Sequence, residues 1–282
     1  MQDVPAIFDL NLVQFPRDAP KLVLLHGLGG THRYWQFGLE KLKSRYHVII
    51  IDLLGFGDSA KPWKIYSKEL HLRALHATLS HFGEFLLVGH SLGAALSIAY
   101  AAKYPEQVKG LVLMSLPLFK SKPEAYNWMR RTPSGWLMTN MLVAALTCIV
   151  TRRVAGKLLP YFLKEFPREI VDDLVKHNFM SSTTSLWQVL YNQSIFDDIL
   201  RLDKQSAIRC IHAVNDATAP YEPVKELCNK QVEWQLTSLP LSDHHPWLWD
   251  HAACEEVILD ALQSVFSETV HKGPALETTT ID

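Results

Sequence analysis

The chain has 282 residues, is 48% apolar, and carries 28 Lys and Arg against 29 Asp and Glu, which gives a net charge of −1. This balance excludes a general field drawing the whole protein toward nucleic acid or an anionic membrane. The length suits one large α/β domain with an insertion. The four cysteines, Cys148, Cys210, Cys228 and Cys254, are widely spaced, which favours a reducing compartment over a disulfide framework.

The two ends of the chain and its longest apolar run bear on location. The first residues, MQDVPAIFDL, lack the basic start and apolar stretch of a secretion signal, so a cytoplasmic protein is expected. Residues 136–150 are apolar but fall short of the ~20 residues that span a bilayer. Basic pairs at 130–131 and 152–153 flank this run. They indicate solvated helix ends or, alternatively, a segment that binds peripherally to a lipid surface. Residues 269–282 are expected to form a flexible tail.

Six short apolar runs alternate with helix-like segments along most of the chain. They predict strands at residues 21–26, 45–52, 85–90, 109–117, 207–216 and 232–240. Each run is almost continuously apolar, which is typical of strands covered on both faces. The alternation predicts a doubly wound, mostly parallel sheet with helices on both sides, the α/β class.

The alternation stops between residues 118 and 206. This stretch contains helix-like segments such as PREIVDDLVKHNFM and three tryptophans, with no convincing strand. We expect a helical cap over one edge of the sheet. The predicted domains are therefore a core of residues 1–117 and 207–268, a cap of residues 118–206, and the tail.

A serine follows the third predicted strand, within GHSLG at residues 89–93. Gly89 and Gly93, two residues to either side, permit a strand-to-helix turn too tight for a side chain on either flank. Such a turn holds Ser91 in a strained backbone conformation and points its hydroxyl out of the sheet, beside the first amides of the next helix, which can stabilise an oxyanion. A hydroxyl becomes a nucleophile only with a base and a group that orients the base.

Candidates for both partners lie downstream. Asp216 comes just after a predicted strand, so it is expected at the same sheet edge as Ser91. Its rivals precede that strand in helix-like sequence: Asp197, Asp198 and Asp203. For the base, His244 and His245 follow the last predicted strand, and His251 enters the last helix.

Five motifs in this order carry a family resemblance: HGLGG (26–30), DLLGFGDS (52–59), GHSLG (89–93), NDATAP (215–220) and HPWLWD (245–250). The chain resembles Ser-Asp-His members of the α/β-hydrolase fold superfamily, in its esterase and C–C hydrolase branch. The resemblance spans roughly residues 20 to 265. It implies a helical cap inserted between the sixth and seventh core strands. It departs from the family at the start, where about twenty residues leave room for an abbreviated sheet edge.

The resemblance also implies roles for individual residues. Ser91 would be the nucleophile, Asp216 the acid and His245 the base, with the oxyanion held by the backbone amides of Leu28 and Leu92. The pair Asp243-His244 stands where the family has smaller residues, so His244 remains open as the base. His26 and Asp52 lie in family motifs, and we expect them to orient loops.

The predicted function is a serine hydrolase that cleaves a hydrophobic carboxylic ester through an acyl-enzyme on Ser91. The alternatives are a C–C bond hydrolase of a vinylogous diketone, an acyltransferase, and a non-catalytic ligand receptor that retains the fold. The expected partner is a small hydrophobic acyl substrate, with peripheral membrane contact through the cap as the one membrane interaction left open. No cofactor or metal is expected: His71, His76 and His81 do not share one helix face.

Overall fold

The computed structural model describes residues 8–151, 153, 161, 164–192, 194–203 and 207–270. Within them one sheet contains β1 (Leu12–Phe15), β2 (Lys21–Leu25), β3 (His47–Ile51), β4 (Phe85–His90), β5 (Val108–Met114), β6 (Ala207–Ala213) and β7 (Trp234–Leu239). The strand order is β1-β3-β2-β4-β5-β6-β7, and each neighbouring pair is parallel except β1 with β3. The predicted α/β class with a mostly parallel sheet is confirmed.

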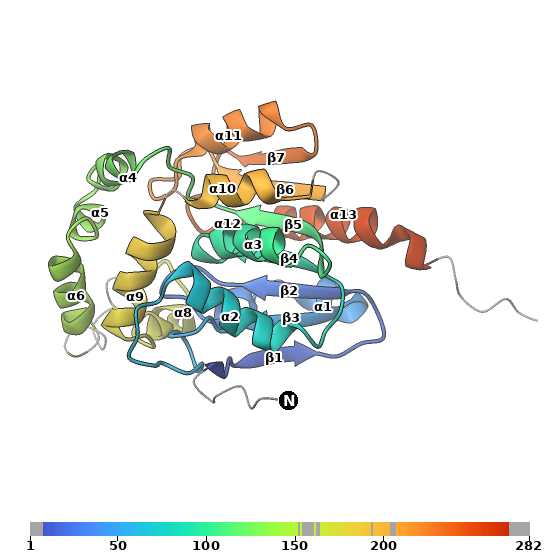
Figure 1. Ribbon diagram of the computed structural model, residues 1–282, viewed down its shortest axis with the longest axis horizontal. Helices are drawn as coiled ribbons and strands as arrows, with labels where there is room; N and C mark the ends of the chain where they lie inside the picture. The colour runs from blue at the N-terminus through green and yellow to red at the C-terminus, as the bar shows by residue number, and fades with distance from the viewer. Residues whose placement is uncertain are drawn as a thin grey trace, which may run out of the picture.

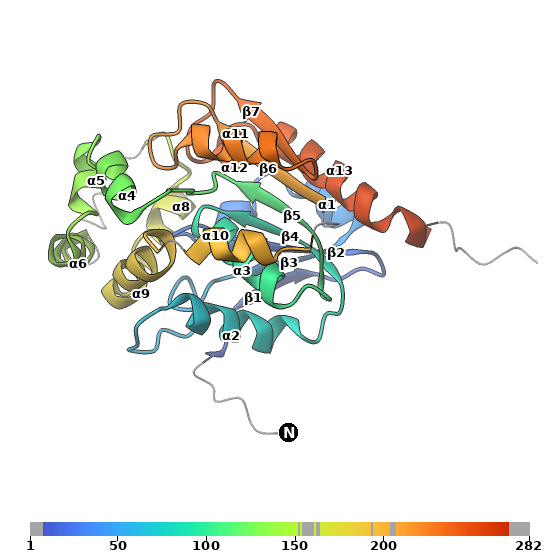
Figure 2. The same ribbon diagram turned by 45° about the horizontal axis from the view of Figure 1, so that its top comes forward.

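Both faces of the sheet are covered, which explains the continuous apolar runs. Successive residues of β2 enter opposite cores: Val23 and Leu25 pack on one side, Leu22 and Leu24 on the other. The first side is covered by α2 (Lys68–Leu79), α3 (Leu92–Lys103), α10 (Ser194–Arg201) and α11 (Tyr221–Lys230). The second is covered by α1 (Glu40–Arg45), α12 (Pro246–Trp249), α13 (His251–Val270) and the 3-10 turn η2 (His32–Trp35), as the two views show (Figure 1, Figure 2).

The sheet edge near the N-terminus is short. In the described residues one strand, the four-residue β1, precedes β2, and it runs antiparallel to β3. The sequence pattern did not predict β1, because it is too short for a clear alternation. The helical insertion lies between β5 and β6 of this sheet. Its strand ordinal is lowered by the short sheet edge, so the predicted placement of the cap is not contradicted.

The insertion between β5 and β6 is helical in its described part. We call six of its elements the cap helices: α4 (Lys122–Met129), α5 (Pro133–Leu137), α6 (Met141–Val150), α8 (Arg168–Asp173), α9 (Phe179–Ser185) and the π-helical η4 (Leu186–Leu190). They stand beyond one end of the sheet, with α4, α5 and α6 outermost (Figure 1). The last insertion helix, α10, instead packs against the core through Ile195.

Hydrogen bonds attach α9 to loops of the core. The Ser181 hydroxyl donates to the Gly55 carbonyl at 2.8 Å, and Thr184 Oγ1 accepts from the Tyr66 amide at 2.8 Å. At the other end of the chain α13 continues to Val270, so the first two residues of the predicted tail are helical. Residues 271–282 lie outside the described part. No helix in the described residues is long and apolar enough to cross a membrane.

Candidate active site

Ser91 lies at a strained turn between β4 and α3. Its φ of 51° and ψ of −110° fall in a region that residues with a side chain rarely adopt. The flanking glycines make the turn possible: a Cβ on Gly93 would lie 2.4 Å from the Leu25 carbonyl oxygen, and one on Gly89 would lie 2.4 Å from the Gly93 carbonyl. The Ser91 amide donates to the Met114 carbonyl at 2.9 Å. The ends of β4 and β5 and the start of α3 thus fix the position of this serine.

The structure brings Ser91 together with Asp216 and His244. His244 Nε2 is 3.1 Å from Ser91 Oγ, and His244 Nδ1 is 2.8 Å from Asp216 Oδ2. The three residues follow β4, β6 and β7, whose carboxyl ends share one edge of the parallel sheet. The arrangement has the hydrogen-bond order of a nucleophile, a base and an orienting acid.

The Asp216 carboxylate is buried but well hydrogen-bonded. Its Oδ1 accepts from the amides of Thr218 and Ala219, each at 2.8 Å. Burial raises the pKa of Asp216, but the charge and hydrogen bond of His244 and the Ala219 amide outweigh it and hold the pKa below its usual value. An ionised Asp216 accepts a hydrogen bond from the N–H at His244 Nδ1, so the proton stays on Nδ1 and Nε2 is left to accept from the Ser91 hydroxyl.

The rival acid Asp198 lies elsewhere in the molecule. Its Oδ2 is 2.5 Å from Lys68 Nζ, so it joins α10 to α2 in an ion pair.

The prediction that His245 pairs with Ser91 and Asp216 is wrong. His245 is the N-cap of α12, and its ring lies among aromatic rings, 5.9 Å from Tyr34 and 5.5 Å from Phe166 between centroids. Its amide donates to Asp243 Oδ1 at 2.7 Å, at the start of α12. Burial, reinforced by His244, lowers the pKa of His245 to about 4. The ring is therefore neutral near pH 7 and packs as an aromatic side chain.

His90 contributes a contact that the sequence did not reveal. Its Nε2 donates to the His244 carbonyl at 2.7 Å, and its ring stacks on Tyr34 with centroids 4.6 Å apart. Burial, with His244 and His245 nearby, holds the pKa of His90 well below its usual value. A neutral ring with its proton on Nε2 thus anchors the backbone of His244. The only hint in the sequence was a histidine directly before Ser91.

The two amides expected to bind an oxyanion lie in segments that flank Ser91. Leu92 is the first residue of α3, where a backbone amide has no partner within the helix. Leu28 lies in a turn closed by the Gly30 amide and the Gly27 carbonyl at 3.1 Å, a bond that does not use the Leu28 amide. A Cβ on Gly27 would lie 3.2 Å from Ser91 Cβ, so this turn lies directly against the serine.

His26 connects the same turn to the end of β3. Its Nδ1 is 2.7 Å from the Gly27 carbonyl oxygen, and its Nε2 accepts from the Leu53 amide at 2.9 Å. Burial lowers the pKa of His26, consistent with a neutral ring that donates at one nitrogen and accepts at the other.

Asp52 ties neighbouring loops together. It accepts from the His32 amide at 2.5 Å, the Asn11 side chain at 2.8 Å and the Asp58 amide at 2.9 Å. Burial raises the pKa of Asp52, but hydrogen bonds led by the His32 side chain hold it below its usual value. His32, Asp52 and Asp58 are close enough in space for metal ligands, yet the Asp52 oxygens are already engaged.

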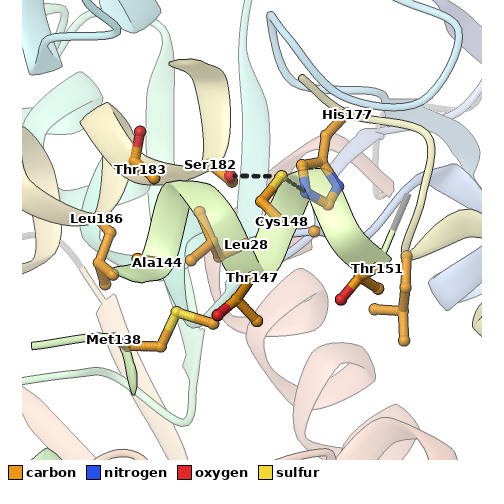
Figure 3. A pocket seen from close by; sticks show the side chains of 12 residues that line it. Leu28, Met138, Ala144, Thr147, Cys148, Thr151, His177, Ser182, Thr183 and Leu186 are labelled. Carbon is orange, nitrogen blue, oxygen red and sulfur yellow. Dashed lines mark hydrogen bonds between the residues drawn. The ribbon is translucent and has the colours of Figure 1, made fainter. Parts of the chain in front are cut away.

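A cavity of about 240 Å³ lies between the cap helices and the turn that contains Leu28 (Figure 3). Most of its surface is apolar. Its polar side includes Cys148, whose Sγ is 3.1 Å from His177 Nε2 and accepts from the Ser182 hydroxyl at 3.5 Å. The lining residues are Leu28, Gly29, Met138, Ala144, Thr147, Cys148, Thr151, Leu174, His177, Ser182, Thr183 and Leu186. Ser91 is not among them; Leu28 joins the cavity to the serine.

Ion pairs hold α8 against this same turn region. Asp173 is buried and accepts hydrogen bonds from the Thr31 hydroxyl and from Arg33 Nη1, the latter at 3.2 Å. Lys176 Nζ is 2.9 Å from Asp173 Oδ1, the same oxygen that accepts from Arg33. The cap is thereby fixed to the segment that follows the turn containing Leu28.

Comparison with known proteins places this site in a family context. The model of the alpha/beta hydrolase fold matches residues 20–207. A (lyso)-N-acylphosphatidylethanolamine lipase of Mus musculus is 30% identical over 166 residues, which are 55% of this chain and 48% of the relative's length. Lipase 1 of Psychrobacter immobilis is 43% identical over 97 residues, which are 33% of this chain and 30% of the relative's length. The chain thus matches about half the length, or less, of these curated relatives.

Solved structures show the same fold. A carboxylesterase of Nitrososphaera gargenis superposes with a TM-score of 0.68 at 18% identity, over 92% of this chain and 96% of its own. A bromoperoxidase of Bacillus anthracis superposes with a TM-score of 0.72 at 19% identity, over 90% and 95%.

Proposed function

Because the chain belongs to the alpha/beta hydrolase fold family, with relatives named lipases, we propose that it is a serine hydrolase that cleaves a hydrophobic carboxylic ester through an acyl-enzyme on Ser91. The observation that carries the proposal is the hydrogen-bonded sequence from Ser91 Oγ through His244 to Asp216. A serine at this position differs from the aspartate that epoxide hydrolases of this fold use.

In the first half of the reaction Ser91 Oγ attacks the ester carbonyl while His244 Nε2 takes its proton. Asp216 stabilises the imidazolium that forms. The amides of Leu28 and Leu92 hold the oxyanion, a contribution of about 3–4 kcal/mol per donor in comparable sites. The tetrahedral intermediate collapses, the ester C–O bond breaks, and His244 returns the proton to the departing alcohol.

In the second half, water gives a proton to His244 and attacks the acyl carbon. The acyl–Ser91 bond breaks, the carboxylic acid leaves, and the proton returns to Ser91 Oγ. If an alcohol replaces water, the same acyl-enzyme performs acyl transfer. Acyl transfer is a second candidate activity because one relative is named a 1-acylglycerol-3-phosphate O-acyltransferase, from Rattus norvegicus. It is 32% identical over 171 residues, which are 55% of this chain and 48% of the relative's length.

The apolar cavity is the proposed site of the acyl chain. It begins at Leu28, next to the proposed oxyanion site, and continues between α6 and α9. Its volume of about 240 Å³ is below the ~300–1,000 Å³ of typical ligand pockets, so acyl chains of medium length are expected to fit best.

A panel of p-nitrophenyl esters of increasing acyl length tests the proposal. We expect turnover to rise to a medium chain length and then fall, and Ser91→Ala to abolish it while the protein keeps its melting temperature. A fluorophosphonate should label the wild type and leave Ser91→Ala unlabelled. Hydrolysis that survives Ser91→Ala would contradict the proposal, and ester products that appear when an alcohol is added would identify acyl transfer.

A further inference from the structure

The outermost cap helix, α6, has two apolar faces with different surroundings. Ala144, Thr147, Cys148 and Thr151 line the cavity. Leu142, Leu146 and Val150, four residues apart, form a stripe on the opposite side, because successive steps of four stay on one helix face. The exposed fractions of Leu142 and Leu146 are 81% and 61%.

Two further exposed apolar side chains lie on the same two outer helices. Met141, the first residue of α6, is 42% exposed, and Trp136 on α5 is 54% exposed. We call Trp136, Met141, Leu142, Leu146 and Val150 the apolar cap face. These residues lie on α5 and α6, which form the outer margin of the molecule in both views (Figure 1, Figure 2). Leucines exposed to this degree on one helix stripe are unfavourable in water unless another apolar phase covers them.

The charge of the same segment is one-sided. Residues 125–164 contain six of the chain's 28 Lys and Arg and none of its 29 Asp and Glu. The rest of the chain therefore carries 22 basic against 29 acidic residues. The acidic residues resume at the two borders, with Glu124 and Glu165. The net charge near zero is therefore the sum of a basic segment, residues 125–164, and an acidic remainder of the chain.

An apolar helix stripe within a purely basic segment matches the chemistry of an anionic lipid surface. We infer that the apolar cap face docks peripherally on a bilayer containing anionic phospholipid, with Arg130, Arg131 and Arg153 at its border. Arg131 and Arg153 are exposed, and Arg130 Nε donates to Thr139 at 3.2 Å. α6 then separates the lipid on one side from the proposed acyl cavity on the other.

The inference rests on the proposed function and extends it, because it names the lipid bilayer as the place where the enzyme binds its apolar ester. Its test, however, needs no hydrolysis. The 282-residue chain carrying Ser91→Ala is sedimented with phosphatidylcholine vesicles, with or without phosphatidylglycerol. We expect binding about tenfold stronger to the anionic vesicles, and loss of that difference at high salt. Equal binding to both vesicles, or no binding to either, would overturn the inference.

Substitutions locate the surface. Leu142→Asp combined with Leu146→Asp should weaken vesicle binding about tenfold or more, because two apolar contacts are replaced by charges that the lipid repels. Leu200→Asp is the matched control: Leu200 lies on α10 and is also 81% exposed, and its variant should bind as the parent does. Equal weakening by both changes would overturn the proposed location. Arg153→Glu should weaken binding to anionic vesicles alone.

Two further readouts separate the alternatives. With Ser91 intact, the Leu142→Asp, Leu146→Asp protein should hydrolyse a soluble short-chain ester as the wild type does and lose rate only on an ester held in anionic vesicles. Loss on both substrates would overturn the inference. A wild type that binds vesicles but cleaves no ester would refute the proposed function and leave the docking intact. Dimers that dissociate on this double substitution, without vesicle binding, would assign the face to a second copy.

Discussion

The carboxyl edge of the sheet and the cap differ in how their side chains are held. At the sheet edge Ser91, Asp216 and His90 are buried, and backbone groups fix Ser91 and Asp216 while His90 holds the backbone of His244. In the cap, one face of α6 lines the cavity and the opposite face exposes apolar side chains to solvent. The proposed chemistry thus depends on the buried, rigid sheet edge, whereas the proposed acyl site and lipid contact depend on α6, the cap helix that faces solvent on one side.

The largest expected effect separates the two adjacent histidines at the rigid edge. His244→Ala should lower kcat/KM for the preferred ester about 10⁴-fold, because Ser91 loses its base. His245→Ala removes a packed ring and should lower it far less, about tenfold. Steady-state kinetics on both variants, with circular dichroism to check folding, measures the difference. The reverse order would return the base to His245.

A smaller effect is expected in the cap, where selectivity should change without loss of the chemistry. Ala144→Phe places a large ring in the cavity and should shift the preferred p-nitrophenyl ester to a shorter chain, about tenfold in relative kcat/KM. Ala145→Phe, one residue along α6 and not among the cavity residues, is the matched control. Identical chain-length profiles for the two variants would show that the acyl chain lies elsewhere.

The smallest expected effect concerns acid stability at the edge. The pKa of Asp216 is lower in the folded protein, so its contribution is present above the unfolded value of about 3.9 and is lost as pH falls through the folded value. Below about pH 4 the melting temperature of the wild type should therefore fall more steeply than that of Asp216→Asn. Asp18→Asn, at an exposed site, should follow the wild type. Parallel curves for all three proteins would contradict this account.

Much of the fold was predictable because local patterns agree with burial on both faces. The run at 85–90 becomes β4, and the glycines around Ser91 are required by close backbone contacts. β1 was missed because four residues, three of them half-buried, give no clear period. The proximity of Asp216 to Ser91 followed from the shared edge of parallel strands.

The choice between His244 and His245 could not be made from spacing. The two are neighbours after β7, and the outcome depends on contacts with residues far away in the chain. His90 holds the carbonyl of His244, while Tyr34 and Phe166 surround the ring of His245. One local signal was available: Asp243 caps the amide of His245 ahead of Pro246, which assigns His245 to the start of a helix.

A Cβ on Gly93 would collide with the carbonyl oxygens of both Leu25 and His26, the residues that lead directly into the turn bearing Leu28. The start of α3 and that turn therefore rest on the same stretch of main chain with no side chain between them. A side chain at residue 93 would therefore separate the start of α3, where Ser91 precedes the helix, from the turn that bears the proposed oxyanion donor Leu28.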